Sequence, residues 1–140
     1  MDAPPIISRY YSELWNQWRY ELIPELLSPD IVFRGSLGVA VRGSEGFRGY
    51  MQSVQRAFPD FHNVVEEVVS QDDRIAVRLT YRGTHSGPIF GHPATGKRVE
   101  YSGIALFRVA DTVIREGWVL GDTVTLWKQL GVLPREWPAT

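Results

Sequence analysis

The sequence predicts an α+β fold in which helices cover one side of a curved antiparallel sheet. Two observations support this fold class. In the first 60 residues, apolar side chains recur at spacings of three and four, which is typical of amphipathic helices. From residue 61 onward, apolar and polar residues alternate over long stretches, which is typical of strands. Helices followed by a meander of long strands are the element order of an α+β domain.

The first half predicts two helical regions. One spans residues 5–27, where the apolar spacing runs from Ile6 to Trp18, and Pro24 begins a short second helix within it. Residues 28–30 predict a turn, residues 31–34 a short strand, and residues 35–38 a loop. Ser44 is then expected to cap a helix over residues 45–58, which Pro59 ends.

The second half predicts four strands and a closing helix. The strands cover residues 61–70, 74–84, 98–109 and 113–121, and a Gly/Pro-rich loop joins the second to the third. In the second strand, Ile75, Val77, Leu79 and Tyr81 share one face, whereas Arg74, Arg78 and Arg82 share the other. Residues 123–131 predict a short helix that ends at Gly131.

Composition excludes several classes of protein. The chain has 140 residues, which predicts a single domain over residues 1–140. The net charge is −1 with scattered Lys and Arg, which argues against nucleic-acid binding and against a basic membrane patch. No cysteine is present, so disulfides and thiolate zinc sites are excluded, and His62, His85 and His92 lack metal-ligand spacing. These features favour a cytoplasmic protein without a metal or cofactor.

The strand over residues 114–122 is the first candidate site. With a period of two it places Ile114, Glu116, Trp118, Leu120 and Asp122 on one face. A carboxylate on an apolar wall has its pKa raised by ~1–3 units through desolvation, as an acid/base group requires. Asp122 also directly precedes the last helix, where Asp is a preferred N-cap. Residue type alone leaves capping and chemistry both open.

Several motifs occur in order along the chain. The most specific is the stretch from Thr84-His85-Ser86-Gly87 to Pro93-Ala94-Thr95-Gly96-Lys97. The others are Gly43-Ser44-Glu45-Gly46-Phe47-Arg48-Gly49-Tyr50, Ala57-Phe58-Pro59-Asp60-Phe61, Ser102-Gly103-Ile104-Ala105-Leu106-Phe107-Arg108 and Ile114-Arg115-Glu116-Gly117-Trp118 with Asp122. In this order and at these spacings they resemble the SnoaL-like polyketide cyclase (ester cyclase) family of the NTF2-like superfamily. The similarity covers roughly residues 8–131.

This resemblance implies an NTF2-like/cystatin-like α+β cone, a curved antiparallel sheet wrapped around three helices from the N-terminal half, with an apolar pocket at one end. It also implies ring closure of a polyketide by intramolecular aldol condensation without metal or cofactor. The family's acid/base aspartate corresponds to Asp122, and a helix start can orient a carboxylate while it is capped. His92 and Arg34 depart from residues common in the family, which points to a more polar pocket or another substrate.

The other candidates each have a structural alternative. His85 is expected to polarise the acceptor carbonyl, or to be a hydrogen-bonded structural histidine. Glu116 is expected near the substrate, or in an ion pair with an arginine. Tyr50 and Tyr101 are expected to donate to an enolate, or to be core tyrosines. The residues expected to line the substrate pocket are Trp15, Phe33, Phe47, Tyr50, His62, Tyr101, Glu116 and Trp118.

The sequence therefore predicts a cofactor-independent cyclase of a polyketide-type compound, with Asp122 as the base and His85 as the carbonyl-polarising group. The partners expected are a small hydrophobic polycyclic or polyketide substrate and a second copy of the chain, as a homodimer or homotetramer through the outer sheet face. The alternatives are an isomerase, an epoxide hydrolase or cyclase, a hydroxylation partner, or a non-catalytic small-molecule binding domain. An exposed Asp122 that serves only as a cap would favour the non-catalytic alternative.

Overall fold

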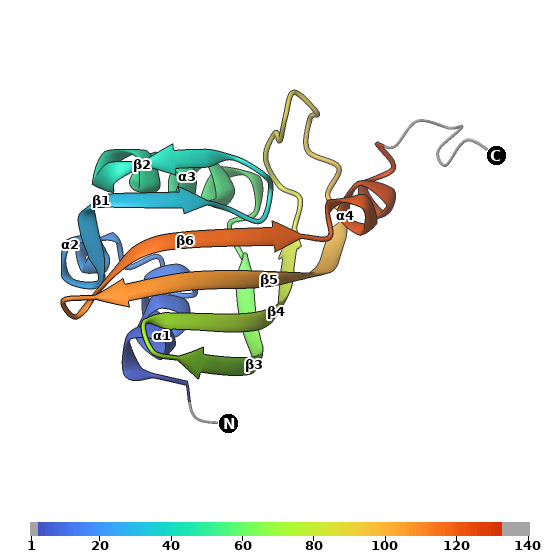
Figure 1. Cartoon of the computed structure of the whole chain (residues 1–140). Helices are drawn as coiled ribbons and strands as arrows, with labels where there is room; N and C mark the ends of the chain where they lie inside the picture. Colours follow the sequence, from blue (N-terminus) through green and yellow to red (C-terminus); the bar gives the residue numbers. More distant parts are fainter. Residues whose placement is uncertain (1–2, 133–140) are drawn as a thin grey trace.

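The computed structural model describes residues 3–132, which form one six-stranded sheet with helices packed on its inner face (Figure 1). The spatial order of the strands is β2-β1-β6-β5-β4-β3. Neighbours are antiparallel except β1 and β6, which run parallel. The strands are β1 Leu27–Arg34, β2 Ala40–Arg42, β3 His62–Gln71, β4 Arg74–Thr84, β5 Arg98–Ala110 and β6 Val113–Gly121. The predicted α+β cone is confirmed for these residues, while residues 1–2 and 133–140 of the expected domain lie outside them.

The N-terminal helical region contains the short second helix expected at Pro24, but the long periodic helix expected before it is divided. It consists of four short elements: α1 Pro5–Arg9, a π-helical η1 Tyr10–Trp15, a 3₁₀ turn η2 Tyr20–Leu22, and α2 Ile23–Leu26. In the π segment the Asn16 N–H donates to the Tyr11 carbonyl five residues back, at 2.9 Å. The wider turn directs four large side chains into the core, those of Tyr10, Tyr11, Leu14 and Trp15.

Two boundaries in the first half were predicted wrongly. Residues 28–30 lie inside β1 rather than in a turn, and a register shift between Leu27 and Val32 accommodates them. Helix α3, Gly43–Ala57, begins one residue before Ser44, and its N-cap position, Arg42, makes no side-chain capping bond. The three-residue strand β2 was not expected, because no alternation is visible in so short a segment.

The alternation of β4 is confirmed. Ile75, Val77, Leu79 and Tyr81 are buried, and the three arginines on the opposite face are exposed. Aromatic rings from η1, α3 and the sheet fill the interior, with Phe33 and Phe47 centroids 4.8 Å apart and Tyr10 and Phe107 centroids 5.2 Å apart. Edge-to-face contacts of this kind add to the burial of apolar area. Aromatic packing therefore fills most of the interior of the cone.

Strand β6 contains a bulge that reverses its faces. Arg108 pairs with Glu116, but the next residue of β5, Val109, pairs with Ile114, so Arg115 is an extra residue. Ile114 therefore points inward, while Gly117 and Val119 point inward after the bulge. Glu116, Trp118 and Leu120 lie on the outer face instead of sharing the inner face with Ile114. The predicted pocket face of this strand is wrong for that reason.

The last helix agrees with the sequence. Helix α4, Thr123–Leu130, begins after Asp122 and ends at Gly131, whose φ of 75° is the left-handed conformation typical of a helix C-terminus. Within residues 3–132 the longest helix, α3, has 15 residues, and none is long and apolar enough to cross a membrane.

Candidate functional site

The interior of the cone holds a small cavity between η1, α3 and the sheet. Its volume is about 20 Å³, roughly the space of one water molecule. Aromatic side chains dominate its wall, together with one serine. The lining residues are Tyr10, Tyr11, Trp15, Phe33, Ser36, Tyr50, Val54, Phe61, Tyr81 and Val119.

The polar groups of this cavity are phenol hydroxyls and the hydroxyl of Ser36. Burial raises the pKa of Tyr50 to about 12 and raises the pKa of Tyr10, Tyr11 and Tyr81 further above the ordinary value. These phenols therefore stay protonated and can donate hydrogen bonds at neutral pH. Among the described residues that line this cavity, none carries a carboxylate or an imidazole. The wall can polarise a carbonyl oxygen, but it carries no conventional base.

A tight turn between β1 and β2, residues 35–39, lies over this cavity. The Ser36 hydroxyl is 2.9 Å from the Tyr101 hydroxyl, which lies behind it. A methyl group on Gly35 would lie only 2.1 Å from the Tyr50 ring, so the turn contacts that ring directly. On the other side, a methyl group on Gly121 would lie 2.4 Å from the Ser36 carbonyl oxygen. Glycine at both positions permits this close approach.

Asp122 lies outside the cavity and is exposed, which corrects the expected apolar environment. Its carboxylate accepts from the Thr125 backbone N–H at 3.1 Å and from the Thr125 hydroxyl at 2.6 Å. These two hydrogen bonds lower the pKa of Asp122, the hydroxyl bond having the larger effect. The predicted N-cap is confirmed, whereas the predicted raised pKa is wrong. Asp122 also borders an open groove of about 340 Å³ on the outer sheet face, with Ile104 and Leu120.

His85 is buried, at 0% exposure, but it does not line the interior cavity. Its ring packs against Phe58, with 5.7 Å between centroids, beneath the loop that follows β4. The Thr95 backbone N–H donates to Nδ1 at 3.2 Å, whereas Nε2 has no hydrogen-bond partner among residues 3–132. Burial lowers the pKa of His85, which favours the neutral form of the ring. These contacts match the structural alternative rather than a group that faces the substrate.

Two of the expected pocket residues lie on the outer sheet face because of the β6 bulge. Trp118 is 45% exposed, and the Arg34 guanidinium lies 5.1 Å from its ring centroid. Glu116 accepts from Arg108 at 2.5 Å, and this bond lowers the pKa of Glu116. The ion-pair alternative for Glu116 is therefore the one observed.

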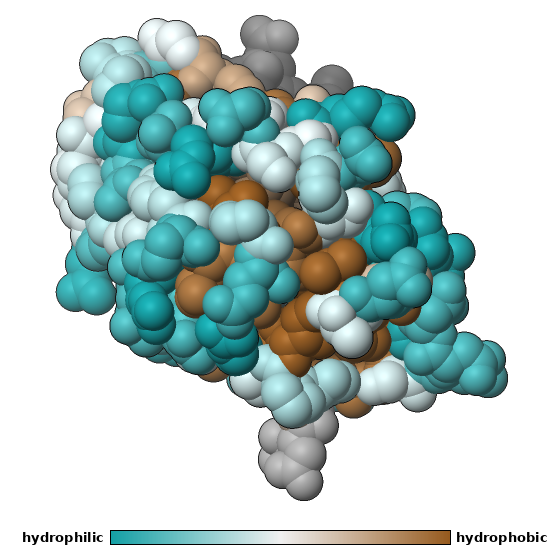
Figure 2. Space-filling view, turned by 90° about the vertical axis from the view of Figure 1, so that its left-hand side faces the viewer, coloured by the Kyte–Doolittle hydropathy of each residue, from teal (hydrophilic) through white to brown (hydrophobic). Residues whose placement is uncertain are grey.

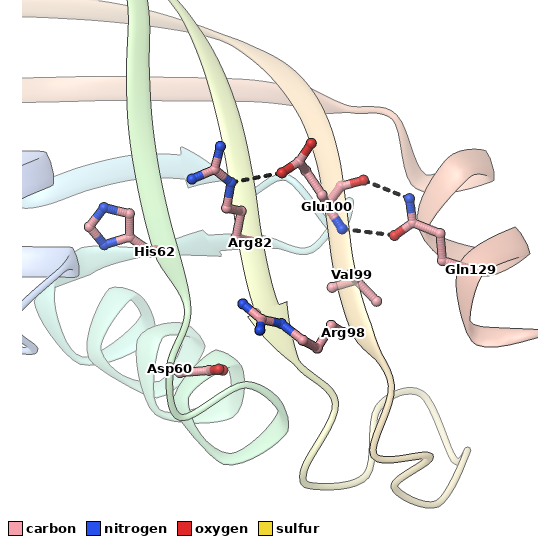
Figure 3. A pocket seen from close by; sticks show the side chains of 8 residues that line it. Asp60, His62, Arg82, Arg98, Val99, Glu100 and Gln129 are labelled. Carbon is pink, nitrogen blue, oxygen red and sulfur yellow. Dashed lines mark hydrogen bonds and ion pairs between the residues drawn. The ribbon is translucent and has the colours of Figure 1, made fainter.

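His62 also lies on the outside, in a charged cleft of about 450 Å³ at the end of β3, β4 and β5 (Figure 3). In this cleft Arg82 donates to Glu100 at 2.7 Å, and the Gln129 side chain bonds the Glu100 backbone at 2.8 Å and 2.7 Å. Both signs of charge occur there, and both carboxylates of the cleft, those of Asp60 and Glu100, already accept hydrogen bonds. His62 is thus remote from the interior cavity.

The remaining expected residues divide between the cavity and the packing around it. Trp15, Phe33 and Tyr50 line the cavity, as expected of a pocket. Tyr101 contacts it through Ser36, and Phe47 is fully buried behind Phe33. The sequence did not single out Ser36, Tyr10, Tyr11 and Tyr81 as site residues. The available signals were the inward position of Tyr81 in the β4 alternation and the place of Tyr10 and Tyr11 in the apolar spacing from Ile6 to Trp18.

Apolar side chains are also exposed on the surface, at one end of the molecule and on the outer sheet face. Figure 2 shows hydrophobic side chains gathered at the centre of the end of the molecule near α2 and the β5–β6 turn, bordered by hydrophilic ones. On the outer sheet face, Val32, Ile104, Leu106, Trp118 and Leu120 are exposed large apolar residues on three adjacent strands. Contiguous apolar surface on a folded protein is typical of an interaction site.

The fold is an NTF2-like α+β cone whose interior cavity is walled by aromatic rings and hydroxyls. The family model for SnoaL-like polyketide cyclases matches residues 6–130. The chain therefore belongs to the SnoaL-like polyketide cyclase family, a family of enzymes.

Three relatives are informative. Aklanonic acid methyl ester cyclase DnrD of Streptomyces peucetius is 27% identical over 129 residues, which are 90% of this chain and 87% of the relative. The structure of IdmH, a putative polyketide cyclase from Streptomyces antibioticus, is 35% identical with a TM-score of 0.78, covering 91% of this chain and 96% of IdmH. AclR, a putative hydroxylase from Streptomyces galilaeus, is 33% identical with a TM-score of 0.73, covering 86% of this chain and 79% of AclR.

Proposed function

We propose that the protein closes a ring in a polyketide-type ester, with the interior cavity as the position of the reacting carbonyl groups. The family and the ester cyclase named among the relatives support the reaction class. The observation that carries the site is the group of protonated phenols around one cavity. Hydrogen-bond donors fixed in a dry site stabilise the negative charge that develops on a carbonyl oxygen.

The reaction proposed is an intramolecular aldol addition. The enol of a carbon between two carbonyls attacks a second carbonyl carbon, so a carbon–carbon bond forms and the π bond of that carbonyl breaks. The new alkoxide takes a proton from a phenol of the cavity, and the enol hydroxyl returns a proton to the phenol group, which leaves the protein unchanged. A carbon flanked by two carbonyls is acidic enough that donors which stabilise its enol assist without a strong base.

In this proposal Tyr50 is the principal donor. Its hydroxyl faces the turn at Ser36 and Leu37, and its ring lines the cavity. Trp15 and Phe33 supply flat walls that would hold a chain folded so that enol and carbonyl meet. The raised pKa of Tyr50 favours the neutral, donating form. Acid/base chemistry of this kind is proposed to need no metal or cofactor.

Asp122 is proposed to act as the cap of α4 rather than as the base. Its carboxylate is already bound by two donors of Thr125, and its lowered pKa makes it a weaker proton acceptor. His85 is likewise proposed to position the loop after β4, since Thr95 occupies its Nδ1.

The test is turnover of aklanonic acid methyl ester by Tyr50→Phe. Loss of one preorganised donor should lower kcat by roughly 10²-fold, while the ring still fills its space. The matched control is Tyr20→Phe, because Tyr20 donates to Gln55 at 2.5 Å and does not line the cavity. Equal turnover by Tyr50→Phe and the native protein would refute the proposed site.

A hydroxylation role is the second candidate, because AclR is a putative hydroxylase of similar identity to IdmH. The two reactions differ in product mass: ring closure by aldol addition leaves the mass of the substrate unchanged, whereas hydroxylation adds one oxygen. Mass spectrometry of the product therefore separates them. A chelator in the same assay tests whether the reaction proceeds without metal.

A further inference from the structure

We propose that residues 35–39 form a gate over the interior cavity, and that the Ser36 hydroxyl holds the place on Tyr101 that a ligand carbonyl oxygen takes. The nature of the ligand rests on the function proposed above. The gate itself rests on the contacts of the turn.

The cavity and the turn do not fit an open binding site. A volume of about 20 Å³ holds no more than one water, whereas ligand sites for small organic molecules have volumes of about 300–1,000 Å³. Some wall segment must therefore move before a polyketide enters. Most of the wall belongs to α3, η1 and the central strands, where hydrogen-bonded elements surround each lining residue. Two wall residues, Ser36 and Phe61, lie outside any helix or strand. The Phe61 ring stacks on Tyr81 of β4, with 5.6 Å between centroids, so Ser36 belongs to the less restrained segment.

The turn is built to move as a unit. It holds itself together by two internal hydrogen bonds, from the Gly35 N–H to the Val39 carbonyl and from the Gly38 N–H to the Gly35 carbonyl, each 3.0 Å long. Beyond it lies β2, an edge strand of three residues that pairs only with β1. Gly38 has a φ of +87° and is exposed at the tip. Displacement of the turn would disturb one short edge strand and leave the rest of the sheet paired.

The contacts that close the gate are those a ligand could replace. Ser36 presents one hydroxyl oxygen to Tyr101 at 2.9 Å, and the backbone of Leu37 and Ser36 approaches the Tyr50 hydroxyl. Opening an empty cavity would leave two buried phenols without these partners, which is unfavourable. A carbonyl oxygen that enters would restore the bond to Tyr101. The gate should therefore stay closed while the cavity is empty, and open at low free-energy cost when a ligand with a carbonyl group enters.

The first measurement is hydrogen–deuterium exchange of the turn amides in the absence of ligand. Ser36→Ala removes the bond to Tyr101 and should raise exchange of the Gly35 and Gly38 amides about fivefold, the effect of one net hydrogen bond. Tyr101→Phe removes the same bond from the other side and should raise exchange equally. Ser53→Ala is the control, since Ser53 donates to the Tyr50 carbonyl on α3 at 2.7 Å. Unchanged exchange in both gate variants would overturn the gate.

The second measurement is binding of alizarin, a flat polycyclic molecule with ring carbonyls, followed by tryptophan fluorescence. Ser36→Ala should bind alizarin about fivefold more tightly, because the competing hydroxyl is gone while Tyr101 remains. Tyr101→Phe should bind it more weakly than the native protein, although its turn exchanges faster. If both variants bind alizarin more tightly, or both bind it more weakly, the proposal that a ligand carbonyl replaces Ser36 on Tyr101 is overturned. If alizarin binds none of the proteins, the proposed ligand site is refuted, while the exchange data still decide the gate.

Discussion

Both oxygens of the Asp122 carboxylate bind Thr125, one to its backbone N–H at 3.1 Å and the other to its hydroxyl at 2.6 Å. The first bond satisfies one of the free donors at the start of α4. Asp122→Ala should therefore lower the free energy of unfolding by about 1 kcal/mol, the usual cost of a lost N-cap. Urea denaturation at neutral pH measures this difference.

The same side chain separates capping from catalysis. Asn is as good an N-cap as Asp, so Asp122→Asn should cost only a few tenths of a kcal/mol. If the phenols are the reacting donors, this variant should turn over its substrate within about twofold of the native rate. A loss of about 10²-fold with stability preserved would restore Asp122 as the catalytic base.

The pH dependence of the cap follows from the lowered pKa of Asp122. The folded state holds the ionised form more strongly than the unfolded state does, so the contribution is present above the unfolded pKa. It is lost as the pH falls below the ordinary value of 3.8 through the folded pKa. The difference in stability between the native protein and Asp122→Ala should therefore be constant near neutrality and disappear in acid.

The buried imidazole of His85 predicts a second pH effect in a different range. Desolvation lowers its pKa below the ordinary value of 6.5, and His92 adds a smaller unfavourable interaction. Below pH 6.5 the unfolded chain takes up a proton that the folded protein resists, so stability should fall as the pH falls from 6.5 through the folded pKa. Chemical denaturation at a series of pH values should show a smaller decline for His85→Gln than for the native protein.

The control for this experiment is His62→Gln, since His62 is exposed at the outer cleft. This variant keeps the buried His85 imidazole, so it should keep the decline attributed to His85. The same decline in His85→Gln as in the native protein would show that another group titrates in this range. Absolute stability is not the criterion, because loss of the bond from the Thr95 N–H to Nδ1 destabilises the variant at every pH.

Much of the architecture could be predicted because most of the strands are regular. The two-residue alternation of β4 placed four apolar side chains inside and three arginines outside, as observed. In β6 the same argument failed at one residue. The bulge at Arg115 has no marker in the sequence, yet it moves Glu116 and Trp118 to the outer face. Alternation assigns side chains to the correct face of a sheet only where the pairing register of the strands is unbroken.

The candidate site was harder to predict than the fold because it depends on distant contacts. Tyr10, Tyr50 and Tyr81 lie on three different elements, and nothing local shows that their hydroxyls meet at one cavity. The resemblance drew attention to Asp122, whose environment depends on its helix neighbour, Thr125. The capping pattern was visible in the sequence, whereas the choice between cap and base required the surrounding structure.

The buried tyrosines predict a loss of folding stability at alkaline pH. All six tyrosines have raised pKa values, mainly through burial, and the pKa of Tyr50 is about 12. Above pH 10 the unfolded chain loses protons that the folded protein retains, so stability is complete below 10 and is lost as the pH rises through the folded values. Absorbance titration should show little phenolate near pH 10 in the folded protein. The urea-unfolded chain should form phenolate normally near pH 10. The same normal titration in the folded protein would contradict the burial of the tyrosines.

The outer sheet face predicts the oligomeric state. Leu106 and Trp118 are paired neighbours on β5 and β6 and are 48% and 45% exposed, and the expected homodimer or homotetramer would cover them. Leu106→Glu with Trp118→Glu would place charges in that apolar contact, which costs several kcal/mol without a partner charge. Light scattering should then show a native assembly of 15.9 kDa chains that dissociates in this variant. Val69→Glu, an exposed change on the edge strand β3, should leave the assembly intact. A monomeric native protein, or an assembly that survives both charges, would show that this face is not the interface.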